Sequence, residues 1–171
     1  MDISANPDKI EDGEAMQSVA VSNEKFSCAI YNVMKDEQEN TIMSPFSVSY
    51  VMAMVSTGAR GNTLQQIQSA CFFPSSPSLQ LGYQQAIPAI RSTDSFIMEA
   101  ANTIFAMEDF SLLPEFEEIL TRNFQSSIQR VDFGDPDVAA RMINNWVEEM
   151  TRERIKNLIT KNMISSATGW S

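Results

Sequence analysis

The stretch from Pro45 to Thr57 is apolar on almost every side. Its side chains are mainly those of Phe, Val, Tyr, Met and Ala, and they leave almost no polar face. A helix that is apolar all round must be buried all round. The stretch is also too short to cross a bilayer, which needs about 20 apolar residues. We therefore expect this segment to be the central helix of a globular core.

Short signals mark both ends of this helix. Ser44 has the side chain of an N-cap, and Pro45 suits the first helical position because its missing N–H would have no partner there. Gly58 can end the helix in the left-handed conformation, and Gly61 can form the turn that follows. These signals predict a helix over Pro45–Thr57 and a tight turn after it.

The rest of the chain combines helical and strand-like patterns. Phe96–Met107 is apolar on both alternating faces, as expected for a long strand covered on each side, and Ile128–Phe133 is a second strand candidate. This combination predicts an α+β fold. The other expected helices are Ser22–Met34 with Ser22 as its N-cap, a short one capped by Asn62 or Thr63 and reaching Cys71, an imperfect one at Leu79–Ile90, Leu113–Phe124, and one that follows Asp135-Pro136 and reaches Met150.

Charge and composition exclude several classes of function. The net charge is −10, from 22 acidic and 12 basic residues, and it disfavours nucleic acids, anionic membranes and polyanionic sugars as partners. The chain has no histidine, which excludes a Ser-His-Asp or Cys-His nucleophile system, a histidine general base and most zinc sites. We expect no catalytic, cofactor-binding or metal-binding residues, and therefore no enzyme.

Three groups of polar or reactive side chains have simple structural interpretations. Ser44 has no base to activate it, so it is expected to cap a helix. Glu148 and Glu149 lie on a helix whose other face is apolar, so a solvated face explains them better than a metal or acid pair does. Cys28 and Cys71 are far apart in the sequence, and we expect two buried thiols; a disulfide or a reactive thiol is the alternative.

The chain divides into an arm, a domain and a tail. Residues 1–18 are polar and acidic and predict a flexible arm, residues 19–164 form the domain, and residues 165–171 form a divergent tail. The first residues lack the basic and apolar regions of a signal peptide, and no apolar run is long enough to span a membrane. As written, the protein is expected in the cytoplasm; a gene model that had lost its first exon would make it extracellular.

Several strings in order along the chain are similar to those of one family, the serpins. Residues 40–49 resemble the family's strand-to-helix entry N-x-x-x-S-P-x-S-[IV], residues 58–63 its G-A-x-G-x-T turn, and residues 101–105 its A-N-x-[LI]-[FY] strand. Residues 131–133 and 143–147 resemble the strand and helix that follow. No single string is decisive, but together they keep the family's order over about Val19–Ile164. The motif residues are Ser44, Pro45, Ser47, Gly58, Gly61, Thr63, Asn102, Asn144, Trp146 and Thr151.

The resemblance implies a serpin-like α+β fold truncated to its N-terminal helices and the first strands of its main sheet. Serpins inhibit serine proteases by offering an exposed loop as bait and inserting the cleaved loop as a new strand of that sheet. In the family, the loop and the two strands that accept it lie beyond the part matched by this chain. We therefore expect a chain that is not inhibitory alone, whether by truncation, alternative splicing or a fragmentary gene model.

Two further expectations concern partners. The alternative function is an interaction module or decoy, which would pair with another serpin chain, such as a serpin C-terminal half, through its open sheet edge. We also expect poor solubility, a molten compact state or self-association. The reason is that the apolar helix and the eleven methionines would lose part of their cover. A serine protease is the partner that the family implies.

Three details of the resemblance concern particular positions of the chain: the shutter serines, the exit of the last helix and a possible heparin-type site. Ser44 and Ser47 correspond to serines of the family's shutter, where the main sheet opens. Glu153-Arg154 replaces the glycine and lysine that the family usually has, which puts the geometry of that helix exit in question. Leu79–Ser92, which matches a basic helix in heparin-activated members, has only Arg91 as a basic residue, so no heparin-type site is expected.

Overall fold

A computed structural model describes residues 13–35, 40–91 and 102–164 of the chain. Helices dominate this part of the protein, and two short strands are the only strands within it. The elements are α1 (Glu14–Met34), α2 (Pro45–Gly58), α3 (Gly61–Cys71), α4 (Ser76–Arg91), β1 (Thr103–Met107), α5 (Pro114–Phe124), β2 (Ser127–Val131), α6 (Pro136–Met150) and the 3₁₀ turn η1 (Lys161–Met163).

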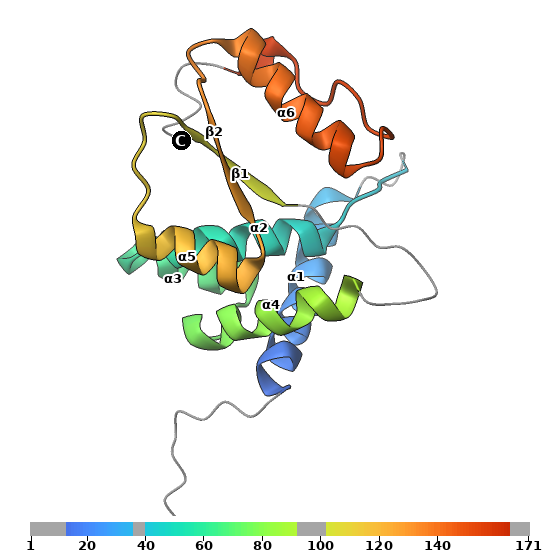
Figure 1. The fold of residues 1–171 in the computed structure, drawn as a ribbon. Helices are drawn as coiled ribbons and strands as arrows, with labels where there is room; N and C mark the ends of the chain where they lie inside the picture. The colour runs from blue at the N-terminus through green and yellow to red at the C-terminus, as the bar shows by residue number, and fades with distance from the viewer. Residues whose placement is uncertain (1–12, 36–39, 92–101, 165–171) are drawn as a thin grey trace, which may run out of the picture.

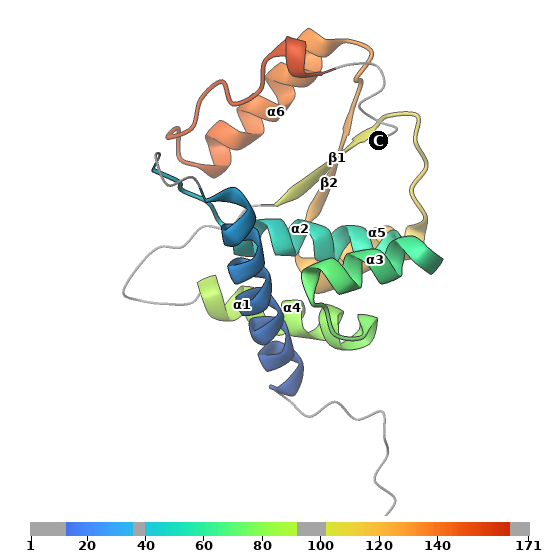
Figure 2. The ribbon, with the colours of Figure 1, turned by 180° about the vertical axis from the view of Figure 1, so that it is seen from behind.

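The two strands separate two layers of helices. β1 and β2 pair in parallel, with Thr103 opposite Ser127 and Met107 opposite Val131, and α5 forms the crossover between them. Helices α1 to α5 lie on one side of this pair and α6 lies on the other (Figures 1 and 2). The fold of the described residues is therefore α+β, as the sequence predicts.

Alternating side chains of the strands belong to two different cores. Ile104 and Ile128 pack against the buried cluster of α1, α2, α4 and α5. Phe105 and Met107 pack against a second cluster, which Val131 shares with residues of α6. The predicted strand, apolar on both faces and covered on both, is confirmed for residues 103–107, while residues 96–101 lie outside the described part of the chain.

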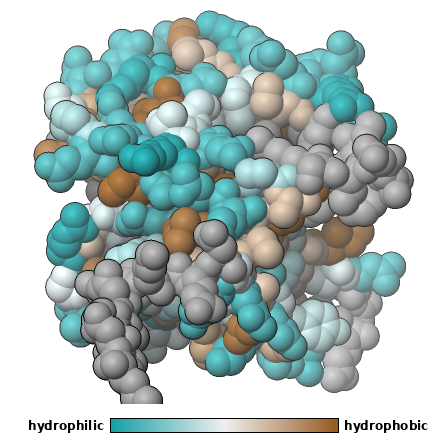
Figure 3. Space-filling model, turned by 60° about the horizontal axis from the view of Figure 1, so that its bottom comes forward, coloured by the Kyte–Doolittle hydropathy of each residue, from teal (hydrophilic) through white to brown (hydrophobic). Residues whose placement is uncertain are grey.

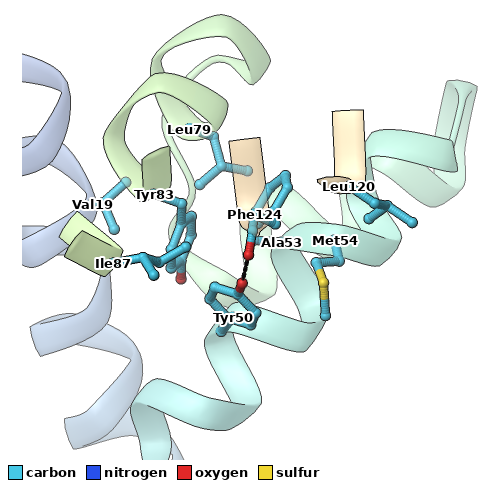
Figure 4. Packing of buried hydrophobic residues seen from close by; sticks show 9 residues of the cluster. All are labelled: Val19, Tyr50, Ala53, Met54, Leu79, Tyr83, Ile87, Leu120 and Phe124. Carbon is cyan, nitrogen blue, oxygen red and sulfur yellow. Dashed lines mark hydrogen bonds between the residues drawn. The ribbon is translucent and has the colours of Figure 1, made fainter. Parts of the chain in front are cut away.

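Three aromatic rings form the centre of the larger core. The rings of Tyr50 and Tyr83 meet edge to face with centroids 5.3 Å apart, and Tyr50 meets Phe124 in the same way at 5.8 Å. The Tyr50 hydroxyl donates a hydrogen bond to the Phe124 carbonyl oxygen (Figure 4). The Ser49 hydroxyl lies 3.0 Å from the Tyr83 hydroxyl, so both buried phenol groups have a polar partner.

The first and last residues of α2 agree with the capping signals in the sequence, except for the backbone conformation of Gly58. Ser44 is the N-cap, and Pro45 is the first helical residue. Gly58 is the last helical residue and does not have a left-handed backbone. The helix ends at Ala59, whose backbone is extended. The prediction of a left-handed Gly58 is therefore wrong.

One face of α2 is uncovered in the described protein. Val48, Val51 and Val55 are 43%, 44% and 46% exposed, while Tyr50, Ala53 and Met54 are buried on the opposite side. The spacing of three and four residues places the three valines in one line along the helix, which we call the α2 stripe. The prediction of burial on all sides is thus wrong for these three residues.

The first helix begins at Glu14, eight residues before the predicted start. Ser22 is not its N-cap but lies in mid-helix, where it is buried and donates a hydrogen bond of 2.5 Å to the Phe72 carbonyl oxygen. The additional turns pack closely on α4, because a Cβ added to Gly82 would lie 2.5 Å from the Ala15 carbonyl oxygen. This close helix contact extends α1 into the range predicted as a flexible arm, and residues 1–12 lie outside the described part.

Smaller differences affect the remaining elements. The α3 helix has Arg60 as its N-cap with no side-chain cap, so neither Asn62 nor Thr63 fills that role, while Gly61 has the positive φ of +57° expected at the turn. The α6 helix begins at Pro136, directly after Asp135, as predicted, and the Asp135 carboxylate caps it by accepting a hydrogen bond of 3.0 Å from the Val138 N–H.

The surface has few extended features on the side of the large helical layer. There, hydrophobic residues stand mostly as separate spots among hydrophilic ones (Figure 3).

Cys71 is buried as expected, but Cys28 is exposed, and neither forms a disulfide. Among the helices of residues 13–35, 40–91 and 102–164, none is long and apolar enough to cross a membrane.

Candidate functional site

The ten motif residues do not converge on one pocket. The structure places them at four positions: the start of α2, the turn between α2 and α3, the entry to β1, and α6 with its exit. Each position joins one element to the next, so the motif residues hold backbone and packing contacts. Within the described residues, no group of three His, Cys, Asp or Glu side chains could hold a metal ion.

The first position is the N-terminus of α2. The hydroxyls of Ser44 and Ser47 lie 2.9 Å apart, and the Ser47 N–H donates to the Ser44 oxygen at 3.4 Å. Pro45, between them, occupies the first turn, where its missing N–H leaves no unsatisfied partner. Ser44 therefore acts as a helix cap in this structure.

The second position is the turn from α2 to α3. A Cβ added to Gly58 would lie 3.2 Å from the ring of Phe116, so the glycine allows α5 to approach the end of α2 closely. Gly61 supplies a left-handed backbone at +57°, which costs a glycine little. Thr63 is exposed on the first turn of α3.

The third position joins the beginnings of the two strands. The Ser126 hydroxyl donates a hydrogen bond of 3.2 Å to the carbonyl oxygen of Asn102, the residue before β1. The Thr103 hydroxyl donates to the Ser127 carbonyl oxygen at 2.9 Å. These bonds set the start of the parallel register, and nothing in them depends on the Asn102 side chain.

The fourth position is α6 and the segment that follows it. The Asn144 amide donates to the Ile159 carbonyl oxygen and accepts from the Ile159 N–H, both at 2.8 Å, so one side chain holds the returning segment at two atoms. The Thr151 hydroxyl accepts from the Ile155 N–H at 3.1 Å. Trp146 meets Phe105 of β1 edge to face at 5.8 Å and so ties α6 to the sheet.

The exit of α6 has two consecutive left-handed residues. Arg152 and Glu153 have φ values of 51° and 61°. The Glu153 N–H bonds to the Glu148 carbonyl oxygen and the Arg152 N–H to the Glu149 carbonyl oxygen, which is the pattern of a Schellman end. Glycine is the residue that left-handed positions favour, so the backbone is strained at both Arg152 and Glu153.

A lysine joins the two acidic side chains of this exit. The Lys156 ammonium lies 2.7 Å from the Glu148 carboxylate and 3.5 Å from that of Glu153. The hydrogen bond from Lys156 to Glu148 raises the pKa of the ammonium. These side chains are largely exposed, so the pairs contribute little stability, but they replace the hydrophobic contact that usually closes a Schellman end.

Two buried or bridging groups were not foreseen from the sequence. Ser49 pairs with Tyr83, and burial raises the pKa of the Tyr83 phenol to about 12. Arg130 donates to the Glu117 carboxylate at 2.7 Å and to the Phe110 carbonyl oxygen, which links β2 to α5 and to the connection before it. The charged Arg130 next to the buried Val131 in a predicted strand was the available signal for the second group.

Both strands have an open edge within the described residues, and that of β1 is one of the two. Within the described residues, β1 has a strand partner on one side only, which is β2. An unpaired strand edge presents backbone donors and acceptors that can bond to another strand. The α2 stripe is a second uncovered surface among the described residues.

Comparison with known proteins gives one consistent result. The family model described as "Serpin (serine protease inhibitor)" matches residues 21–170. The chain is 30% identical to serpin B3 of Homo sapiens over 90% of its own length and 29% identical to the leukocyte elastase inhibitor of Sus scrofa, also over 90%. Ovalbumin from emu has a similar structure, with a TM-score of 0.80 over 88% of this chain at 25% identity.

These relatives are much longer than the chain. The matched part spans 44% of serpin B3, 42% of the leukocyte elastase inhibitor and 44% of emu ovalbumin. The chain thus spans less than half the length of the proteins that it resembles.

Proposed function

The chain belongs to the serpin family, and we propose that its 171 residues form a packing unit of that fold and do not trap a protease by themselves. The observation that carries this proposal is the sheet: β1 has a neighbour on one side only within the described part of the chain. Serpin inhibition inserts a cleaved loop as a new strand between two others. A two-stranded pair with α5 as its crossover offers no such slot.

The contacts of the motif residues support the same interpretation. Gly58, Asn144 and Trp146 each hold one element against another, and Ser44 caps α2, so their contacts are those of structural residues. We therefore propose that the chain is not an enzyme. The protease partner implied by the family would require residues beyond these 171.

A protease challenge tests the proposal. The 171-residue polypeptide is incubated with elastase-like, trypsin-like and chymotrypsin-like serine proteases, and the products are separated on an SDS gel. We expect cleavage products and no SDS-stable complex. A full-length inhibitory serpin, such as the leukocyte elastase inhibitor with an elastase, is the positive control. An SDS-stable band with the 171-residue chain would overturn the proposal.

A second candidate function is an interaction module that pairs with other serpin chains. The uncovered α2 stripe and the open edge of β1 favour it, because both are surfaces that another chain could cover. The test mixes the chain with a serpin C-terminal half and measures co-elution in size-exclusion chromatography. Co-elution that weakens in a variant with the three stripe valines changed to threonine would support the module, and absence of co-elution would count against it.

Partners and location follow from the proposal as predictions. A heparin-type cofactor site is not expected, because the segment 79–92 carries a single basic residue in an acidic chain. A cytoplasmic location remains the prediction for the chain as written.

A further inference from the structure

A cavity of about 280 Å³ lies where the end of α2 meets the start of α5. The connection between β1 and α5 forms its third wall. Gly58, which lines it, follows Val55 by three residues, so the cavity lies at the C-terminal end of the α2 stripe. The residues that matter for its chemistry are Arg60, Phe110, Leu112, Glu115, Phe116 and Ile119.

Contacts within the protein hold the walls of this cavity in place. Gly58 has no side chain, which lets the Phe116 ring lie against the end of α2; a Cβ there would be 3.2 Å from the ring. On the opposite wall, Arg130 donates to the Phe110 carbonyl oxygen and to the Glu117 carboxylate of α5. The apolar wall is therefore formed by contacts that require no ligand, as in pre-formed small-molecule sites.

The rim of the cavity carries an arginine held by two backbone carbonyls. The Nη1 atom of Arg60 donates to the carbonyl oxygens of Thr57 and Ala59, each at 2.8 Å. Within the described residues, the other two guanidinium nitrogens make no hydrogen bond, so the fork that recognises carboxylates remains available. The side chain is thus oriented at its base and open at its tip.

The second charge at the rim is Glu115, in the first turn of α5. It forms no ion pair or hydrogen bond among the described residues, and its position at the helix N-terminus suits a negative charge. The rim therefore combines one cation that can bind an anionic group and one anion that opposes it. This gives the site two charges whose effects on a charged ligand have opposite signs.

We propose that this cavity binds a small aromatic carboxylate, with its ring against Phe116 and its carboxylate on Arg60. The volume lies just below the range of about 300–1,000 Å³ that is typical of small-molecule pockets, so it restricts the ligand to one as small as a fused ring system. The apolar floor supplies the burial of the ring, and a charge-assisted bond to the guanidinium orients the ligand.

The test uses 2-naphthoate and its neutral analogue 2-naphthalenemethanol as probes of the 171-residue chain, followed by ligand fluorescence. We expect saturable binding of naphthoate that is at least about tenfold tighter than that of the alcohol. Arg60→Gln should remove this difference. Glu115→Gln should tighten naphthoate by about twofold to fivefold without affecting the alcohol. Arg122→Gln, at an exposed position further along α5, is the matched control and should change neither affinity.

Two results would overturn the proposal. One is equal or non-saturating binding of the acid and the alcohol, which would indicate adsorption to apolar surface in general. The other is a change of the naphthoate affinity in the same direction in the Arg60 and Glu115 variants, or no change of that affinity in either. Because both side chains are exposed, the variants keep the fold, and circular dichroism of each variant checks this.

Discussion

Removing the apolar character of the α2 stripe should reduce self-association of the chain. The change is Val48→Thr, Val51→Thr and Val55→Thr in one variant. Threonine keeps the branched shape of valine and a similar helix propensity, so the substitution changes polarity with little effect on α2 itself. The three positions face away from the buried Tyr50 side of the helix.

The expected magnitude follows from the exposed fractions. Full burial of a valine side chain is worth roughly 1.5–3 kcal/mol, and these side chains are 43–46% exposed, so covering the stripe is worth about 2–4 kcal/mol per chain. A symmetric contact between two stripes would double this, to about 4–8 kcal/mol. Association costs roughly 4–15 kcal/mol, so the stripe alone supports only weak self-association. The triple variant should weaken it by at least about tenfold.

Sedimentation equilibrium over a range of protein concentrations measures this effect. A matched pair of single variants supplies the control: Val51→Thr changes a residue that is 44% exposed on the stripe, and Val21→Thr changes one that is 42% exposed on α1. We expect a shift in the first and none in the second. An unchanged association constant in the triple variant would refute the reasoning, and so would equal shifts in the two single variants.

Four other changes have expected outcomes. Ellman's reagent should modify Cys28 rapidly in the native chain and Cys71 only on unfolding, because Cys71 is buried and burial raises the pKa of its thiol; Cys28→Ser should abolish the fast phase. Gly82→Ala should lower the free energy of unfolding by about 1–3 kcal/mol in urea titrations, although this change usually stabilises a helix, because the added Cβ would lie 2.5 Å from the backbone of α1. Burial holds the folded-state pKa of Tyr83 at about 12, above the ordinary value near 10, so the free energy of unfolding should fall as pH rises from about 10 to about 12, and Tyr83→Phe should remove that part of the fall. Glu153→Gly should be more stable than Glu153→Ala by about 1 kcal/mol, since both variants remove the carboxylate and only glycine relieves the left-handed backbone; equal stability would contradict the strain.

Features that depend on neighbouring residues were predictable from the sequence. Ser44-Pro45 and Asp135-Pro136 each place a capping oxygen one residue before a proline, and both helices begin there. The cap and the proline act within one turn, so no distant contact is needed to decide them. The alternation of β1 was equally informative, because its period of two assigns Ile104 and Phe105 to opposite faces whatever covers each face.

Features that depend on distant contacts were not predictable. The start of α1 is decided by its packing on α4 at Gly82, which lies far along the chain. Ser22 has the composition of an N-cap, but the carbonyl of Phe72 provides its partner in mid-helix. The burial of α2 depends on what lies over Val51, and periodicity reports only which side chains are apolar, not whether a neighbour covers them.

The motif residues were similarly predictable in position but not in contact. Asn144 is identified by its string alone, yet its two bonds to Ile159 require the chain to turn back along α6. The cavity beside Phe116 carries no sequence signature, because it results from the meeting of two helix ends and one connection.

The two helical layers should differ in how firmly they are held. The larger layer closes around Tyr50, Tyr83 and Phe124, which come from three helices and are buried whatever covers the α2 stripe. The α6 layer contacts the rest through one face of a two-stranded pair, where Phe105 and Met107 pack against the second cluster and Trp146 meets the Phe105 ring. A pair of strands is marginal in isolation, so this layer should open before the larger core does. Self-association would then arise from uncovered surfaces on a folded core, and a protected Cys71 thiol is the observation that separates this state from a molten one.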